Sequence, residues 1–364
     1  MVLKVVFTAA TRPAGPVGGD FCIDSCESPS VTPFLKPREL VFVCHLARRS
    51  VFFFFLNMVM SFGALAQIGV SAENTPALLT PWTTIKGAWV AAPLNPFSTL
   101  PQGPKPTGFL SWQMPVAVAA RDNYVYVADA GRRLIYRYDQ MLQTLAPFTS
   151  YASGLESGIA VARDLSLYVI DRNARQVLRF SSEGRLLQKF GNEMELALPV
   201  AVVLDDATGN IWVADGLYDR VVMFNSLGRV LHVFKPSAGK SVSAMAKGQQ
   251  GLYLLDPLGR QIVVMGLDGA DRFTFGQDTL KMPGAIAVDR FNRVFVSDSF
   301  DNSIKIFELG KLVASVGTTG TIRASFNRIT HLYIDQDTLY VADSLNARIQ
   351  TFRITPAATV PNEY

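Results

Sequence analysis

Short stretches of alternating apolar and polar residues recur along most of this chain, and the clearest of them end in an aspartate. They include YVYVAD, LYVID, IWVAD and LYVAD, and the terminal aspartates are Asp129, Asp171, Asp215, Asp256, Asp298 and Asp343. A period of two residues predicts β-strands that turn one face towards a core. No stretch with a 3.6-residue period long enough for a helix interrupts them. The pattern therefore predicts an all-β chain.

These aspartates are regularly spaced, at intervals of 42, 44, 41, 42 and 45 residues. Within one repeat, from Pro283, four apolar segments follow one another with polar or glycine-bearing turns between them: GAIAVD, RVFVSD, SIKIF and LVASVG. Four short strands in a repeat of this length are typical of one blade of a β-propeller. We therefore predict a six-bladed β-propeller of four-stranded antiparallel blades.

The clearest repeat reads P-x-x-I-A-V-D-x-x-x-x-V-x-V-x-D-x-x-x-x-x-I-x-x-F, from Pro283 to Phe307. It resembles the NHL repeat, and residues 113–354 are similar to an array of six such repeats. The resemblance covers the propeller only, and its specificity lies in the six registered copies. Some propellers of this type bind RNA on one face.

The last repeat lacks a segment for its outermost strand. It ends with IQTFRI at Ile354, and the tail of residues 355–364 is broken by prolines, which cannot donate a ladder hydrogen bond. Upstream of the first repeat, TTIKGAWVAA at residues 83–92 alternates well enough to supply that strand. We predict that this segment completes the sixth blade and closes the ring, which removes the exposed edges of an open array.

The repeated aspartates favour a structural role, because a symmetric ring of six copies lacks the asymmetry that chemistry at one site needs. An aspartate just after a strand can accept hydrogen bonds from backbone amides of the next turn. In five repeats an arginine follows the turn and is expected to pair with an aspartate: Arg133, Arg175, Arg220, Arg260 and Arg348.

The N-terminal part carries the features of an export signal. Arg48 and Arg49 precede the apolar run VFFFFLNMVMSFG, and the small-residue triplet 64–66 follows. A basic segment, an apolar core and an A-x-A triplet make a secretory signal peptide. We assign the signal to residues 46–66, with the mature chain beginning at Gln67, and therefore predict a secreted or periplasmic protein.

Two alternatives concern this region. Cleavage after Ala72 is the second choice, and an uncleaved anchor over residues 51–70 is the rival, because that stretch is just long enough to span a bilayer. Residues 1–45 lack periodicity and are interpreted as an over-extended gene start or a disordered segment. Residues 67–112 are proline-rich and are expected to contain the closing strand but no independent domain.

Net charge and cysteine content limit the classes of partner and of chemistry that we expect for this chain. Of the 34 Lys and Arg and the 30 Asp and Glu, six and four precede Gln67, which leaves a net charge near +2. This balance is not the footprint of a nucleic-acid-binding protein. All three cysteines, Cys22, Cys26 and Cys44, precede the mature chain, so neither a disulfide framework nor a thiol nucleophile is expected. We expect a monomer without a metal or cofactor.

The central axis is the place where similar propellers carry out chemistry. Amidating lyases of this architecture hold metals through several histidines, and gluconolactonase-like hydrolases use a cluster of Glu, Asn and Asp. The mature chain has only His232, in an outer strand, and His331. Counted from the end of the first strand, His331 replaces Pro115, Gly158, Ala201, Ser243 and Ala285 in the other repeats, and Tyr333 replaces mostly Ala or Val. The two rings could line a ligand pocket or plug the channel.

Turns between second and third strands share one face of a propeller with the links between blades. This face collects arginines and aromatic residues, a composition found at binding hot spots. The candidate binding residues there are Arg132, Arg172, Tyr218 and Phe300. We predict a non-enzymatic exported propeller that binds a protein, peptide or envelope glycan on this face. The alternatives are a propeller-type lyase or hydrolase with an axial pocket near His331 and Tyr333, and a membrane-tethered scaffold.

Overall fold

The computed structural model describes residues 77–90, 108–149, 158–237 and 240–356. The chain divides into two units, Met1–Gly69 and Val70–Tyr364, and all described residues belong to the second. The predicted signal peptide, its alternatives and most of the C-terminal tail lie outside the described residues. Within the described ranges, no helix is long and apolar enough to cross a membrane.

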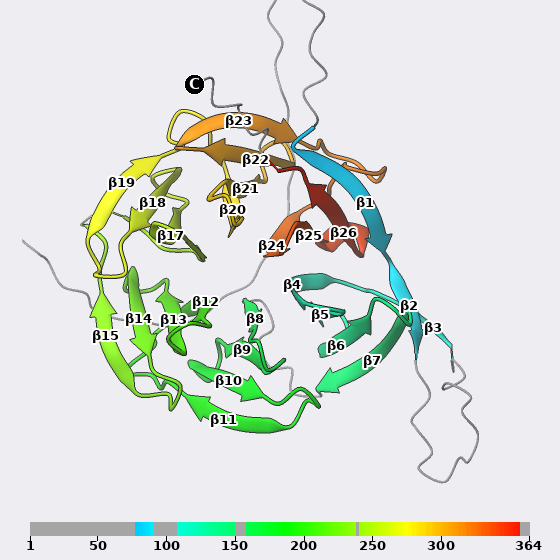
Figure 1. Ribbon diagram of the computed structural model, residues 1–364, viewed down its shortest axis with the longest axis horizontal. Helices are drawn as coiled ribbons and strands as arrows, with labels where there is room; N and C mark the ends of the chain where they lie inside the picture. Colours follow the sequence, from blue (N-terminus) through cyan, green and yellow to red (C-terminus); the bar gives the residue numbers. More distant parts are fainter. Residues whose placement is uncertain (1–76, 91–107, 150–157, 238–239, 357–364) are drawn as a thin grey trace, which may run out of the picture. The chain divides into compact units, whose positions relative to one another are not determined.

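Six four-stranded antiparallel blades form a closed ring (Figure 1), which confirms the predicted fold. Each blade runs from an innermost first strand to an outermost fourth strand, and the blade boundaries match the repeats. Among the described residues, the single helical element is a short 3₁₀ turn, Ser344–Asn346.

The first three blades follow one another in chain order. Blade 1 contains β4 (Pro115–Arg121), β5 (Tyr124–Asp129), β6 (Leu134–Asp139) and β7 (Thr144–Thr149). Blade 2 contains β8 (Ile159–Val161), β9 (Leu167–Asp171), β10 (Gln176–Phe180) and β11 (Leu186–Phe190). Blade 3 contains β12 (Pro199–Asp205), β13 (Asn210–Asp215), β14 (Arg220–Phe224) and β15 (Val230–Phe234).

The last three blades continue this order. Blade 4 contains β16 (Ala244–Gly248), β17 (Gly251–Asp256), β18 (Gln261–Met265) and β19 (Asp271–Phe275). Blade 5 contains β20 (Pro283–Val288), β21 (Val294–Asp298), β22 (Ser303–Glu308) and β23 (Lys311–Val316). Blade 6 contains β24 (Ile329–Asp335), β25 (Thr338–Asp343), β26 (Arg348–Ile354) and the N-terminal strand β1 (Leu79–Ile85).

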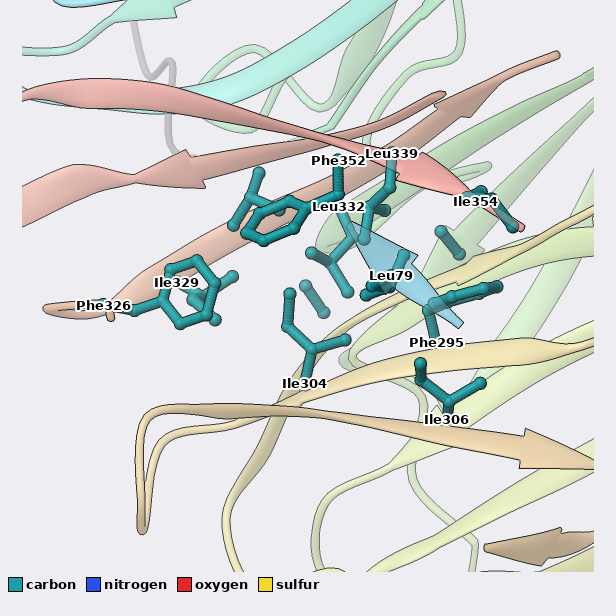
Figure 2. Close-up of a cluster of buried hydrophobic side chains, with 13 residues drawn as sticks. Leu79, Phe295, Ile304, Ile306, Phe326, Ile329, Leu332, Leu339, Phe352 and Ile354 are labelled. Carbon is teal, nitrogen blue, oxygen red and sulfur yellow. The ribbon is translucent and has the colours of Figure 1, made fainter. Parts of the chain in front are cut away.

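The hydrophobic core lies between neighbouring blades rather than at one centre. The second strands are buried on both faces, because each face packs against an adjacent blade. Figure 2 shows the cluster between blades 5 and 6, where Phe295, Ile304 and Ile306 meet Leu339, Phe352 and Ile354. Each blade is therefore stabilised by the burial of both its faces.

The ring closes between β1 and β26, as predicted, but the closing strand is not the predicted segment. β1 pairs antiparallel with β26 from Leu79 opposite Ile354 to Ile85 opposite Ile349. The expectation of residues 83–92 is therefore wrong in its boundaries. Leu79 and Ile85 are the buried positions of the strand, and Figure 2 shows Leu79 inserted in the cluster between blades 5 and 6.

The remainder of the predicted closing segment joins the next blade. β2 (Gly87–Val90) pairs in parallel with β7 of blade 1 and antiparallel with β3 (Phe109–Ser111). Gly87 permits this crossing, because its φ is 145° and a Cβ there would lie 2.0 Å from the Leu110 carbonyl oxygen. Residues 91 and 92 lie outside the described residues. The N-terminal segment thus bridges blades 6 and 1.

Candidate functional site

The repeated aspartates connect two backbone segments of their own blade. The Asp298 carboxylate accepts hydrogen bonds from the amides of Lys281 and Met282 at 2.8 and 2.9 Å, and from the amide of Phe300 at 3.1 Å. Lys281 and Met282 belong to the link that enters the blade, whereas Phe300 belongs to the turn after β21. The carboxylate therefore fixes the link as well as the turn that the sequence predicts.

The same arrangement recurs around the ring. Asp129 accepts from the amides of Gln113, Met114 and Arg132, and Asp215 accepts from those of Ala197, Leu198 and Leu217. All six aspartates are buried: Asp129, Asp171, Asp215, Asp256, Asp298 and Asp343. Buried carboxylates are stable only when hydrogen-bonded or paired, and the amides provide these bonds.

Only two of the five arginines expected to pair with these aspartates do so. Arg220 donates to Asp215 at 3.0 Å, and Arg348 donates to Asp343 at 2.7 Å. Both lie five residues after their aspartate and directly opposite it in the β-ladder. Arg133, Arg175 and Arg260 lie four residues after and have positive φ. The left-handed backbone directs these three side chains away from the carboxylates, so the expected pairing is wrong for them.

We use the term turn face for the side of the ring formed by the turns between second and third strands and by the links between blades. The four binding residues predicted from the sequence all belong to these turns, which are distributed over blades 1, 2, 3 and 5. Arg132 donates from its guanidinium to the Ser111 carbonyl at 3.0 and 3.1 Å. Arg172 is half-buried. Tyr218 is exposed, with the Arg220 guanidinium 4.8 Å from its ring centre, and Phe300 is 68% exposed.

The turn face also carries a row of exposed apolar side chains, of which the sequence prediction included only Phe300. The second residue after the aspartate is large, apolar and 54–83% exposed in four consecutive blades: Leu217, Leu258, Phe300 and Leu345. We call these four residues the apolar arc. In blades 1 and 2 the corresponding residues are Gly131 and Asn173, with arginines beside them. The second position of these turns is therefore apolar in blades 3–6, whereas the turns of blades 1 and 2 each carry two arginines and the turn of blade 4 carries the exposed Arg260 as well.

A second candidate site is the cavity on the ring axis, which has a volume of about 700 Å³ and is lined by the first strands. His331 and Tyr333, both from β24, lie in its wall. The β-ladders place His331 at the position of Ala117, Ala201 and Ala244 in other blades. Each of these residues pairs with the residue directly before the terminal aspartate of its blade. The observed register thus replaces Pro115 and Ser243 in the predicted alignment by Ala117 and Ala244.

Tyr333 likewise replaces small residues. It pairs with Tyr340, and the corresponding first-strand residues include Ala119, Val203 and Ala246. Blade 6 therefore projects two rings where other blades leave space. Both rings lie in the wall of the cavity, beside small residues of the neighbouring first strands.

Both rings are held in their neutral forms. Burial lowers the pKa of His331 to about 4, opposed by a hydrogen bond with the backbone of Val118. The Nδ1 atom of His331 has no hydrogen-bond partner among the described residues. Burial raises the pKa of Tyr333 to about 12. A neutral imidazole and a neutral phenol can orient a ligand, but these pKa values are poorly matched to general acid–base catalysis near neutral pH.

Charged residues surround one end of this cavity and pair with one another. Arg121 of blade 1 donates to Asp206 of blade 3 at 2.9 Å, and Lys247 of blade 4 lies 3.3 Å from Asp205. Burial alone would lower the pKa of Arg121, but the attraction and hydrogen bond of Asp206, together with the charges of Tyr333 and Asp335, raise it above its ordinary value. Within the described ranges, no group of three His, Cys, Asp or Glu side chains has the geometry to hold a metal ion.

No model of a known protein family matches the chain, and no curated protein matches its sequence. Solved structures match its fold. A virginiamycin B lyase from Staphylococcus aureus gives a TM-score of 0.51 at 12% identity, covering 67% of this chain and 96% of that chain. A gluconolactonase from Xanthomonas campestris gives 0.53 at 14% identity, covering 67% and 87%. A protein of unknown function from Bacteroides thetaiotaomicron gives 0.56 at 14%, covering 66% and 70%. These similarities establish the propeller fold and nothing finer.

Proposed function

We propose that this chain is an exported propeller of NHL type that binds a protein partner through the turn face. The apolar arc on blades 3–6, beside arginines on blades 1 and 2, carries this proposal. Exposed leucine and phenylalanine at one turn position in consecutive blades form a contact surface that a folded monomer does not need for its own stability.

The arginines define the partner more closely. Arg133 is exposed and forms no ion pair among the described residues, and Arg175 forms only a long contact of 3.7 Å with Glu193. Their guanidinium groups are free to bind carboxylates, whereas the arc is suited to apolar side chains. An amphipathic protein segment with apolar and acidic residues satisfies both. A glycan would leave the leucines of the arc without complementary contacts.

Export is part of the same proposal. The residues of the predicted signal support it, as described above, and the mature chain would begin at Gln67. Intact mass measurement of protein recovered from the exported fraction tests this point. A mass that includes residues 51–70 would support the anchor instead.

Site-specific photo-crosslinking tests the binding face in the producing cells. A photoreactive residue at Leu258 or Phe300 is expected to give one discrete protein adduct. The matched controls are Leu227 and Leu309, which are 69% and 87% exposed but lie in turns between third and fourth strands, on the opposite face. Substitution of Leu258 and Phe300 by aspartate should remove the adduct without lowering the melting temperature. Adducts from Leu227 and Leu309 alone, or from none of the four positions, would show that the proposed face is wrong.

A second candidate function is a lyase or hydrolase that acts in the axial cavity. The asymmetric placement of His331 and Tyr333 favours it, and two of the matching structures are named as a lyase and a gluconolactonase. Hydrolysis of simple lactones by the purified protein, lost in His331→Gln and retained in the aspartate variants of the arc, would favour this candidate over the first.

A further inference from the structure

A second hollow, of about 710 Å³, lies at the seam between blades 6 and 1. We call it the seam groove. Its walls come from β1, β2 and β3, from the turn after β24 and from the turn after β6. Both turns belong to the classes that lie opposite the turn face. The seam groove therefore exists only because the N-terminal segment crosses from one blade to the next.

Three large aromatic side chains stand at this groove and are 51–58% exposed: Trp82, Trp89 and Phe109. Trp89 and Phe109 contact each other edge to face at 5.8 Å between ring centres. The Arg353 guanidinium lies 4.2 Å from the centre of the Trp82 ring. These contacts hold the rings in place, yet about half of each side chain remains in solvent, where large apolar surfaces are costly.

The rest of the groove is lined by hydroxyl, amide and carboxylate groups. The Tyr340 hydroxyl donates to Gln140 Oε1 at 3.4 Å, and Gln140 Nε2 donates to the Asp122 carbonyl at 3.3 Å. Both bonds are long, so a ligand hydroxyl can replace either at small cost. Fixed aromatic rings beside weakly engaged polar groups match a ligand that has an apolar face and a rim of hydroxyls.

Charge narrows the ligand further. Among the described residues, three carboxylates line the groove, those of Asp122, Asp335 and Asp337, against one guanidinium, that of Arg353. Asp337 is itself paired with Arg290 at 2.9 Å. The groove is therefore acidic on balance and disfavours an anionic ligand.

We propose that the seam groove binds a neutral oligosaccharide. A pyranose ring has an apolar C–H face, which can stack on Trp82 or Trp89, and equatorial hydroxyls, which can bond to Gln140, Tyr340 and the carboxylates. The volume lies within the range of ligand-binding sites in proteins. A peptide would require apolar side-chain pockets, and the polar lining of the groove offers few of them. This proposal does not depend on the function assigned to the turn face.

The test uses the purified chain and three soluble hexasaccharides: β-1,4-linked glucose, β-1,4-linked N-acetylglucosamine, and galacturonic acid. Tryptophan fluorescence reports on the groove, because Trp82 and Trp89 line it and are about half exposed, whereas the other two of the four tryptophans, Trp112 and Trp212, are buried. At least one neutral hexasaccharide should change the fluorescence with saturation, and calorimetry should confirm the affinity. Galacturonate should bind more weakly or not at all.

Variants locate the binding. Trp82→Ala, Trp89→Leu and Gln140→Ala should each weaken binding by about tenfold or more, because truncation of a central aromatic or polar contact commonly has this effect. The matched control is Phe273→Ala, an exposed aromatic residue on β19 of blade 4, which should leave binding unchanged. Melting temperatures show whether each variant is folded, and the three groove variants report independently. No binding of either neutral hexasaccharide at about 5 mM, tighter binding of galacturonate, or binding that persists in the three groove variants would overturn the proposal.

Discussion

Substitution of Asp343 by alanine should be the most damaging change among the repeated aspartates. Its carboxylate accepts hydrogen bonds from the Asn327 amide and Arg348 Nε, both at 2.7 Å, and from the side-chain amides of Asn346 and Gln350 at 2.9 and 3.1 Å. The Arg348 side chain is only 5% exposed. The variant therefore leaves a buried guanidinium without its counter-charge.

The magnitude follows from this difference in partners. Removing one member of a buried ion pair commonly costs about 3–5 kcal/mol. Within the part of the chain that the structure describes, Asp129 accepts only from backbone amides, and loss of a neutral buried partner costs about 1–3 kcal/mol. We therefore expect Asp343→Ala to lower the free energy of unfolding by about 2 kcal/mol more than Asp129→Ala.

Urea unfolding of both variants, followed by tryptophan fluorescence and circular dichroism, measures the difference. Coincident transitions and unchanged m-values are required for the comparison. Asp343→Asn serves as a further control, because it keeps the shape and one acceptor oxygen. Equal losses for Asp343→Ala and Asp129→Ala, or a larger loss for Asp129→Ala, would refute the reasoning that Arg348 dominates the cost.

Three other changes have defined outcomes. The pKa of His331 is about 4 in the folded protein and its ordinary value is 6.5, so the unfolded state binds a proton at a higher pH than the folded state. Urea titrations should therefore show that, as the pH decreases from 6.5 to 4, the stability of the wild type falls by about 3 kcal/mol more than that of His331→Gln. Arg293→Met should lower the free energy of unfolding by about 3–5 kcal/mol, because Asp289 is buried and paired with Arg293 at 2.7 Å. Arg290→Met breaks the exposed pair with Asp337 and should change the free energy of unfolding by less than about 1 kcal/mol. Gly87→Ala should detach β3, seen as faster amide exchange at Phe109–Ser111, because the added Cβ meets the Leu110 carbonyl.

The propeller could be predicted from the sequence because its information is repeated. Six copies of one alternating pattern, each ending in aspartate, specify strand order and blade number even where one copy is weak. The closing strand has no such repetition. Its burial pattern is interrupted by a bulge between Pro81 and Thr84, which leaves Trp82 exposed. Alternation alone therefore favoured residues 83–92, of which the latter half joins another blade.

The residues of the candidate sites could be predicted from the sequence only in part, for similar reasons. His331 and Tyr333 could be found because they break a pattern of small residues. The pairing of Arg133 and Arg260 was predicted wrongly because the positive φ of those positions, which redirects the side chains, is a property that sequence spacing does not reveal. The seam groove could not be predicted, because Trp82 and Arg353 are about as far apart in sequence as the propeller allows and meet only once the ring has closed.

The pairing of β1 with β26 also determines when this protein can finish folding. Thr83 bonds to Thr351, 268 residues later, through its amide at 3.0 Å. Five blades can form from contiguous chain as it emerges, but blade 6 remains three-stranded until β1 pairs with β26. Contacts between such distant segments are slow to form. Until they do, the outer edge of β26 is an open strand edge of the kind that recruits other chains. The chain is therefore most prone to aggregate in the interval after β26 has formed and before Leu79–Ile85 pairs with it.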